Sequence, residues 1–139
     1  MITIRVLSAV LLLFAAGCAD SIVSECDDEA TVRVDPRLSD IQEKVFDVSC
    51  ATPGCHAGSN PQAGLDLTAA NAYDQLVGVE SVSYPGRSRV VAGNSSESIL
   101  IELMRGSLSP AMPPQGPLDA EIINAIAVWI DNGARRELR

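Results

Sequence analysis

The sequence predicts an all-α protein, a small bundle of about four short helices joined by long loops. Apolar residues recur at helical spacing in four separate stretches of the chain. Residues that favour helix starts precede these stretches, and glycines follow most of them. The connecting segments are rich in Gly, Pro and Asn. Val90-Val91 is the only strand-like pair.

The first helix is expected over residues 39–49. Ser39 with Gln42 three residues later has the pattern of a capping box. Ile41, Val45 and Val48 then mark one apolar face. This helix runs directly into Cys50.

The second and third helices follow irregular segments. Thr68 is expected to cap the second helix and Gly78 to end it. Its apolar side consists of Ala69, Ala72, Tyr73 and Leu76. Asn94 with Glu97 predicts a capping box for a third helix that ends at Gly106. Its apolar residues are Ile99, Leu100, Leu103 and Met104.

The fourth helix has the clearest pattern in the chain. Asp119 is expected to start it and Gly133 to end it. Its apolar residues follow i, i+4, i+7, i+8 spacing and are Ile122, Ile126, Trp129 and Ile130.

The stretch Cys50-Ala51-Thr52-Pro53-Gly54-Cys55-His56 holds two of the four cysteines and the only histidine. Two thiols followed at once by an imidazole is the order needed for covalent haem attachment. Four residues separate the cysteines here, where two are usual, and a turn at Pro53-Gly54 would loop out the extra pair. A Cys50–Cys55 disulfide is the alternative. A zinc site is disfavoured, because structural zinc takes four ligands and only three cluster here.

With these residues the chain resembles a c-type cytochrome domain of the small bacterial mono-haem kind, over roughly residues 38–135. Further likenesses are Ala63-Gly64-Leu65-Asp66-Leu67, Met112-Pro113-Pro114 and the segment 129–134 at the end of the last helix. The resemblance implies a bundle around one haem c, bound covalently through Cys50 and Cys55. It implies His56 as the proximal iron ligand and electron transfer, not catalysis, as the function. The alternatives are a haem-free interaction lipoprotein with a Cys50–Cys55 disulfide, or a five-coordinate haem enzyme or sensor.

The resemblance places the distal iron ligand late in the chain, at Met112. Met112 lies in a loop stiffened by prolines on both sides, whereas Met104 falls at helical spacing with Leu100 and is expected in the core. The second ring nitrogen of His56 is expected to donate to a backbone carbonyl, with Pro61 as the candidate. Four leucines are expected to line the haem faces: Leu65, Leu67, Leu100 and Leu103.

Three charged residues near this site have two interpretations each. Arg87 and Arg89 offer forked donors for haem propionates, but solvated surface arginines are the favoured interpretation. Asp66 is ambiguous in the same way, and capping of its own loop is favoured.

The first residues have the pattern of an export signal. Arg5 precedes an apolar run over 6–16, and Gly17-Cys18 follows. This resembles a bacterial lipoprotein signal over 1–17, with Cys18 as the lipidated residue; ordinary cleavage nearby is the alternative. Residues 18–37 are expected to form an acidic flexible tether that includes Cys26, for which a free thiol and an intermolecular bridge are the two alternatives. The domain then spans 38–135, and 136–139 form a tail.

The chain carries 10 basic and 18 acidic residues, a net charge of −8. Such a surface disfavours nucleic acid, because phosphate binding needs clustered Lys and Arg. A redox protein with a basic docking surface fits better. The export signal predicts a place in the cell envelope, on the periplasmic side or on the outer surface, with membrane contact by the lipid anchor only.

Overall fold

The computed structural model describes residues 32–137, which belong to one compact unit. The expected signal over 1–17, lipidation at Cys18, Cys26 and most of the tether lie outside the described residues. Residues 32–37, at the end of the expected tether, contain no helix.

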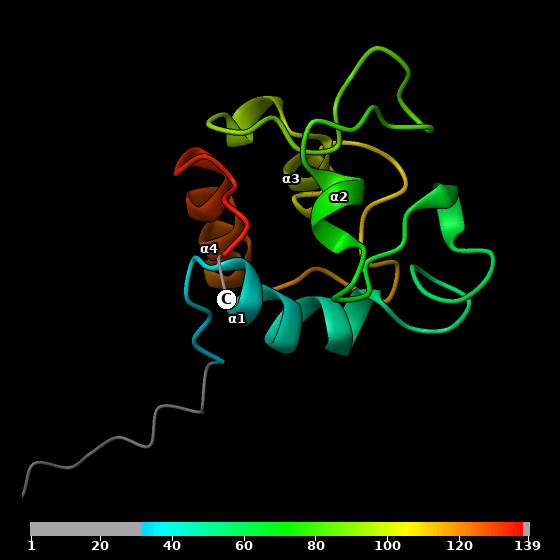
Figure 1. Ribbon diagram of the computed structural model, residues 1–139, viewed down its shortest axis with the longest axis horizontal. Coiled ribbons are helices and arrows are strands. Elements are labelled where there is room, and N and C mark those ends of the chain that lie inside the picture. Colours follow the sequence, from blue (N-terminus) through cyan, green and yellow to red (C-terminus); the bar gives the residue numbers. More distant parts are fainter. Residues whose placement is uncertain (1–31, 138–139) are drawn as a thin grey trace, which may run out of the picture. The chain divides into compact units, whose positions relative to one another are not determined.

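The described residues form helices and loops without a strand, which confirms the all-α class (Figure 1). The segments between the helices pair only at isolated bridges, including Val77 with Val90. In chain order the helices are α1 (Leu38–Ile41), η1 (Gln42–Cys50), η2 (Gln62–Gly64), α2 (Ala72–Leu76), η3 (Ser95–Glu97), α3 (Ile99–Met104) and α4 (Ala120–Asp131).

The first helix lies where the sequence predicts it, but its winding differs. From Gln42 to Cys50 it is a π-helix, closed at its end by the amide of Ala51 donating to Phe46 O. Hydrogen bonds five residues apart bring Phe46 onto the face of Ile41. Phe46 is therefore fully buried, while Val48, predicted on that face, is 66% exposed. The Ser39–Gln42 capping box is also wrong, since Arg37 precedes α1 and no side chain caps it.

The middle helices are shorter than predicted. α2 begins only at Ala72, because residues 68–71 form a turn. Asp66 shapes that turn by accepting hydrogen bonds from Thr68 N at 2.8 Å and from Asn71 Nδ2 at 2.8 Å, which confirms its capping role. The Asn94 cap is also confirmed, since its side chain accepts from Glu97 N. It opens only η3, because the extended backbone of Ser98 separates η3 from α3.

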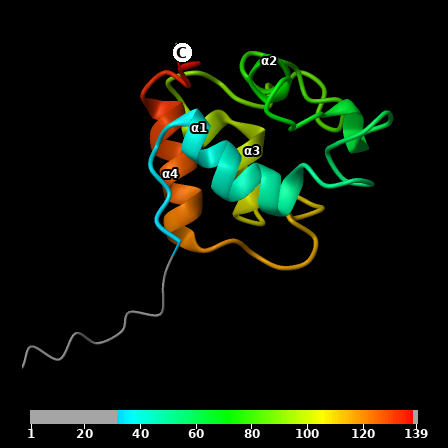
Figure 2. The ribbon, with the colours of Figure 1, turned by 60° about the horizontal axis from the view of Figure 1, so that its bottom comes forward.

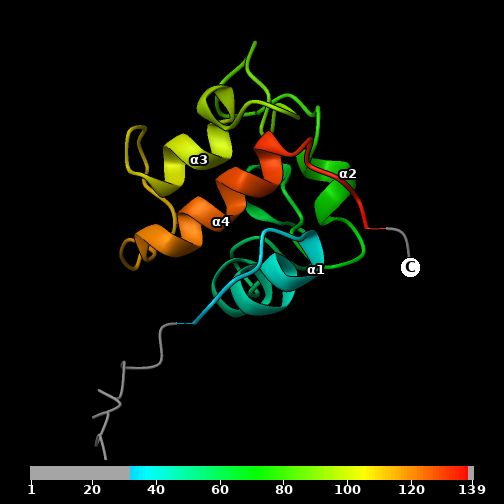
Figure 3. The ribbon, with the colours of Figure 1, turned by 90° about the vertical axis from the view of Figure 1, so that its left-hand side faces the viewer.

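α4 follows its prediction closely and forms the centre of the core. Figures 2 and 3 show it crossing the first helix and lying beside α3, and it contacts both. Ile126, Trp129 and Ile130 are buried against Ile41 and Phe46. Truncating an aromatic side chain in such a core costs about 3–5 kcal/mol. Among the described residues, no helix has the length and apolar character that a membrane crossing requires.

Candidate functional site

A largely apolar pocket opens beside this core, with about 1080 Å³ of space between its walls, its open mouth included. We call residues 50–67 the histidine wall, and α3 with the loop 107–118 the methionine wall. Both walls line the pocket. All four leucines expected to line a haem also line it: Leu65, Leu67, Leu100 and Leu103.

The histidine wall begins where η1 ends. Cys55 N donates to Thr52 O at 3.0 Å, and His56 N donates to Cys50 O at 3.1 Å. Gly54 has φ +86°, a conformation that suits glycine, so the predicted Pro-Gly turn forms. The turn loops out the extra residues and leaves Cys50, Cys55 and His56 all lining the pocket.

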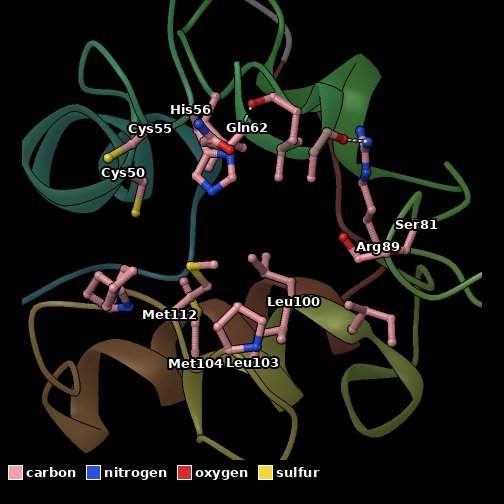
Figure 4. A pocket seen from close by; sticks show the side chains of 18 of the residues that line it. Cys50, Cys55, His56, Gln62, Ser81, Arg89, Leu100, Leu103, Met104 and Met112 are labelled. Carbon is pink, nitrogen blue, oxygen red and sulfur yellow. Dashed lines mark hydrogen bonds between the residues drawn. The ribbon is translucent and has the colours of Figure 1, made fainter. Parts of the chain in front are cut away.

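A backbone carbonyl fixes the orientation of the His56 ring. Its Nδ1 lies 3.2 Å from Leu65 O, and since a carbonyl only accepts, Nδ1 carries the proton. Nε2, which then has a free lone pair, faces into the pocket (Figure 4). The prediction of Pro61 as the partner is wrong: Pro61 O accepts from Gly64 N at 3.1 Å, in the turn that brings Leu65 back to the ring.

Gln42 anchors the histidine wall to the first helix. Its Nε2 donates to Leu67 O at 2.8 Å and to Asp47 Oδ1 at 2.6 Å. Leu67 N in turn donates to His56 O at 2.8 Å, so one buried amide supports the segment that holds the histidine. The sequence assigned Gln42 to a capping box. The sequence signal for its actual role is that Gln42, a polar residue, directly follows Ile41, one of the apolar positions of the helix.

The two pocket cysteines lie together at one side of the pocket, and both thiols are free (Figure 4). Burial, and secondarily the neighbouring Cys55, raises the pKa of Cys50 to about 11. Cys50 is therefore a protonated thiol at neutral pH, which disfavours a thiolate–metal site. Within residues 32–137, no three His, Cys, Asp or Glu side chains lie close enough together to hold a metal ion.

Both methionines of the methionine wall reach the pocket. Met112 N donates to Leu103 O at 3.0 Å, which fixes its backbone against the end of α3. Met104 is only 4% exposed and belongs to the core, as predicted, but it also lines the pocket. Figure 4 shows both side chains rising toward His56 from the opposite side.

Arg89 supplies the only charge among the pocket-lining residues. It is 7% exposed, so the prediction that it is a solvated surface residue is wrong. Its guanidinium donates to Gln75 O at 2.9 Å and Ala63 O at 3.0 Å, and burial lowers its pKa. Arg87, by contrast, is partly exposed and pairs with Glu102 at 2.7 Å. Arg89 and buried Ser81 lie at the side of the pocket away from the two cysteines (Figure 4).

No family model, curated protein or solved structure matches this chain.

Proposed function

We propose that the protein is an electron carrier that holds one haem c in this pocket. Cys50 and Cys55 would bind it covalently, with His56 as proximal iron ligand and Met112 as distal ligand. The observation that carries the proposal is the meeting of two free thiols, a carbonyl-oriented imidazole and a thioether on one apolar cavity.

The distribution of polarity in the pocket fits the shape of a haem. A haem is flat and apolar, with its reactive vinyl groups near one edge and two propionates on another. The pocket has Leu100 and Leu103 between its ends, thiols at one side and a buried arginine at the other (Figure 4). Arg89 would face the propionates, because buried guanidinium groups favour a carboxylate partner.

The chain's own residues would prepare this site for one-electron chemistry, which the bound iron supplies. The Leu65 carbonyl holds the proton on His56 Nδ1 and so keeps Nε2 available as the ligand. Met112 opposite it would fill the sixth position and favour a raised potential. With His56 and Met112 both bound to the iron, no place would remain there for a substrate, so we propose a carrier and not an enzyme.

The setting follows from the N-terminal sequence. We place the protein in the cell envelope on the periplasmic side, attached through a lipid on Cys18 with the acidic segment 18–37 as tether. Its partners would be redox proteins with basic docking surfaces. Acidic residues outnumber basic ones in 32–137 as in the whole chain, although none lines the pocket.

Cysteine substitutions test the proposed attachment. The protein is matured in a periplasm that assembles c-type cytochromes, denatured and weighed by mass spectrometry. The parent chain and the control Cys26→Ser should each retain one haem. Cys50→Ser and Cys55→Ser should retain at most a singly linked haem, and the double variant none. A Cys50–Cys55 disulfide in protein matured with haem available would overturn the proposal.

A further inference from the structure

Few hydrogen bonds hold the loop that carries Met112. Among the described residues, the backbone of the segment 108–116 bonds to the rest of the chain at only two places. One is Met112 N to Leu103 O at 3.0 Å. The other is a side chain, Tyr84, whose hydroxyl donates to Ser109 O at 2.6 Å.

Tyr84 makes this bond from a segment far away in the sequence. It is half-buried and lines the same pocket as Met112 and Pro110. Ser109 precedes Met112 by three residues, and Pro110 restricts the backbone between them. A bond at Ser109 therefore limits how far Met112 can move from the pocket.

The segment that carries Tyr84 is itself braced. Arg87 N donates to Tyr84 O at 3.2 Å, and Ser81 N donates to Arg87 O at 2.8 Å. The Arg87 side chain pairs with Glu102 of α3 at 2.7 Å. Glu102 adjoins Leu103, the residue that accepts from Met112 N, so the contacts close a ring through α3, Arg87, Tyr84, Ser109 and Met112.

We propose that Tyr84 is a positioning residue that clasps the Met112 loop and resists displacement of the methionine from iron. This inference rests on the proposed ligation by Met112. Tyr84 acts through the Ser109 carbonyl on the Met112 loop, the part of the site that has the fewest backbone hydrogen bonds to the rest of the chain. Loss of its hydroxyl frees the loop without altering the ligand itself.

Exchange of the distal ligand tests the clasp. Tyr84→Phe removes only the hydroxyl, and Tyr73→Phe is the matched control, because the Tyr73 hydroxyl has no hydrogen-bond partner within residues 32–137. Imidazole is titrated into the ferric matured protein while the sulfur-to-iron charge-transfer band is followed. Tyr84→Phe should bind imidazole roughly 2- to 10-fold more tightly, the effect of losing one neutral hydrogen bond. Tyr73→Phe should match the parent.

Amide hydrogen exchange at Met112 gives a second readout on the same proteins. It should quicken in Tyr84→Phe and stay unchanged in Tyr73→Phe. If the parent protein lacks the charge-transfer band, ligation by Met112 fails, and the exchange rates alone still decide whether Tyr84 clasps the loop. Equal imidazole affinities and equal exchange rates in the two variants would overturn the clasp, whether or not both differ from the parent.

Discussion

The two walls of the pocket are built in different ways. On the histidine wall, local turns and the amide of Gln42 fix the backbone from Cys50 to Leu67, with His56 bonded at its N, O and Nδ1 atoms. On the methionine wall, the loop before α4 depends on Met112 N and on Tyr84. The chain's own hydrogen bonds therefore order the histidine wall. The other is expected to gain much of its order from what binds in the pocket.

The largest expected effect comes from removing the methionines. Met112→Ala should abolish the sulfur-to-iron band and lower the potential while the covalent haem remains, because His56 and both cysteines are untouched. Met104→Ala should keep the band and lower the free energy of unfolding by about 2–5 kcal/mol, as for other buried apolar truncations. Absorption spectra of the ferric proteins measure the band, redox titration measures the potential, and urea unfolding measures the free energy of unfolding. The reverse result for the band would show that Met104 is the ligand.

Much of the difference between the two walls was predictable from sequence, but not all of it. The order of Cys50, Cys55 and His56 is local, so their meeting on one pocket followed from the Pro-Gly turn. Likewise α4 formed as predicted because its apolar period agrees with its start and stop signals. These are short-range features, which a single sequence records well.

The predictions from sequence were wrong where contacts with residues far away in the sequence determine the structure. The π-helical winding that turns Val48 outward accompanies the burial of Phe46 against the core, and nothing near Val48 signals it. Gln42 binds Leu67, 25 residues away, instead of capping its own helix. Arg89 is buried because carbonyls from two other segments accept its donors. The Tyr84–Ser109 bond likewise joins segments 25 residues apart.

A smaller effect should follow from breaking the anchor of the histidine wall. Gln42→Ala leaves Leu67 O without its buried donor, so the free energy of unfolding should fall by about 1–3 kcal/mol. Gln62→Ala is the control, since the Gln62 amide makes only a 3.4 Å contact with Gly54 O. Urea unfolding of both variants measures the difference. Equal losses would show that Gln42 does not hold this wall.

The protonation of Cys50 tests whether the histidine wall exists before haem binds. In the haem-free chain, Cys50 should be alkylated more slowly without denaturant than with it until pH rises toward 11, because folding raises the pKa of Cys50 to about 11. Because the pKa of Cys50 is raised, the folded chain favours the protonated thiol, and this adds to its stability. The stabilisation is complete below the ordinary pKa of 9.0 and is lost as pH rises through about 11. Equal alkylation rates with and without denaturant would show that the wall is not formed in advance.

The smallest effect expected is on long-range attraction to partners. Electron-transfer rates with a cationic redox protein should fall as salt is added, because the Debye length is only about 8 Å at physiological ionic strength. A variant with Glu25, Asp27, Asp28 and Glu29 changed to their amides is the control for the tether. It should keep most of the salt dependence. Rates that do not vary with salt in the parent would show that its acidic residues do not guide docking.

The absorption spectrum of the ferric protein tests the central claim most directly. The chain is expressed in a periplasm that matures c-type cytochromes, purified and measured without added ligand. The account predicts a six-coordinate low-spin haem spectrum with the sulfur-to-iron charge-transfer band, since His56 and Met112 would occupy both axial positions. A high-spin spectrum would contradict it in favour of a five-coordinate enzyme or sensor, and a protein without haem absorption in favour of an interaction lipoprotein.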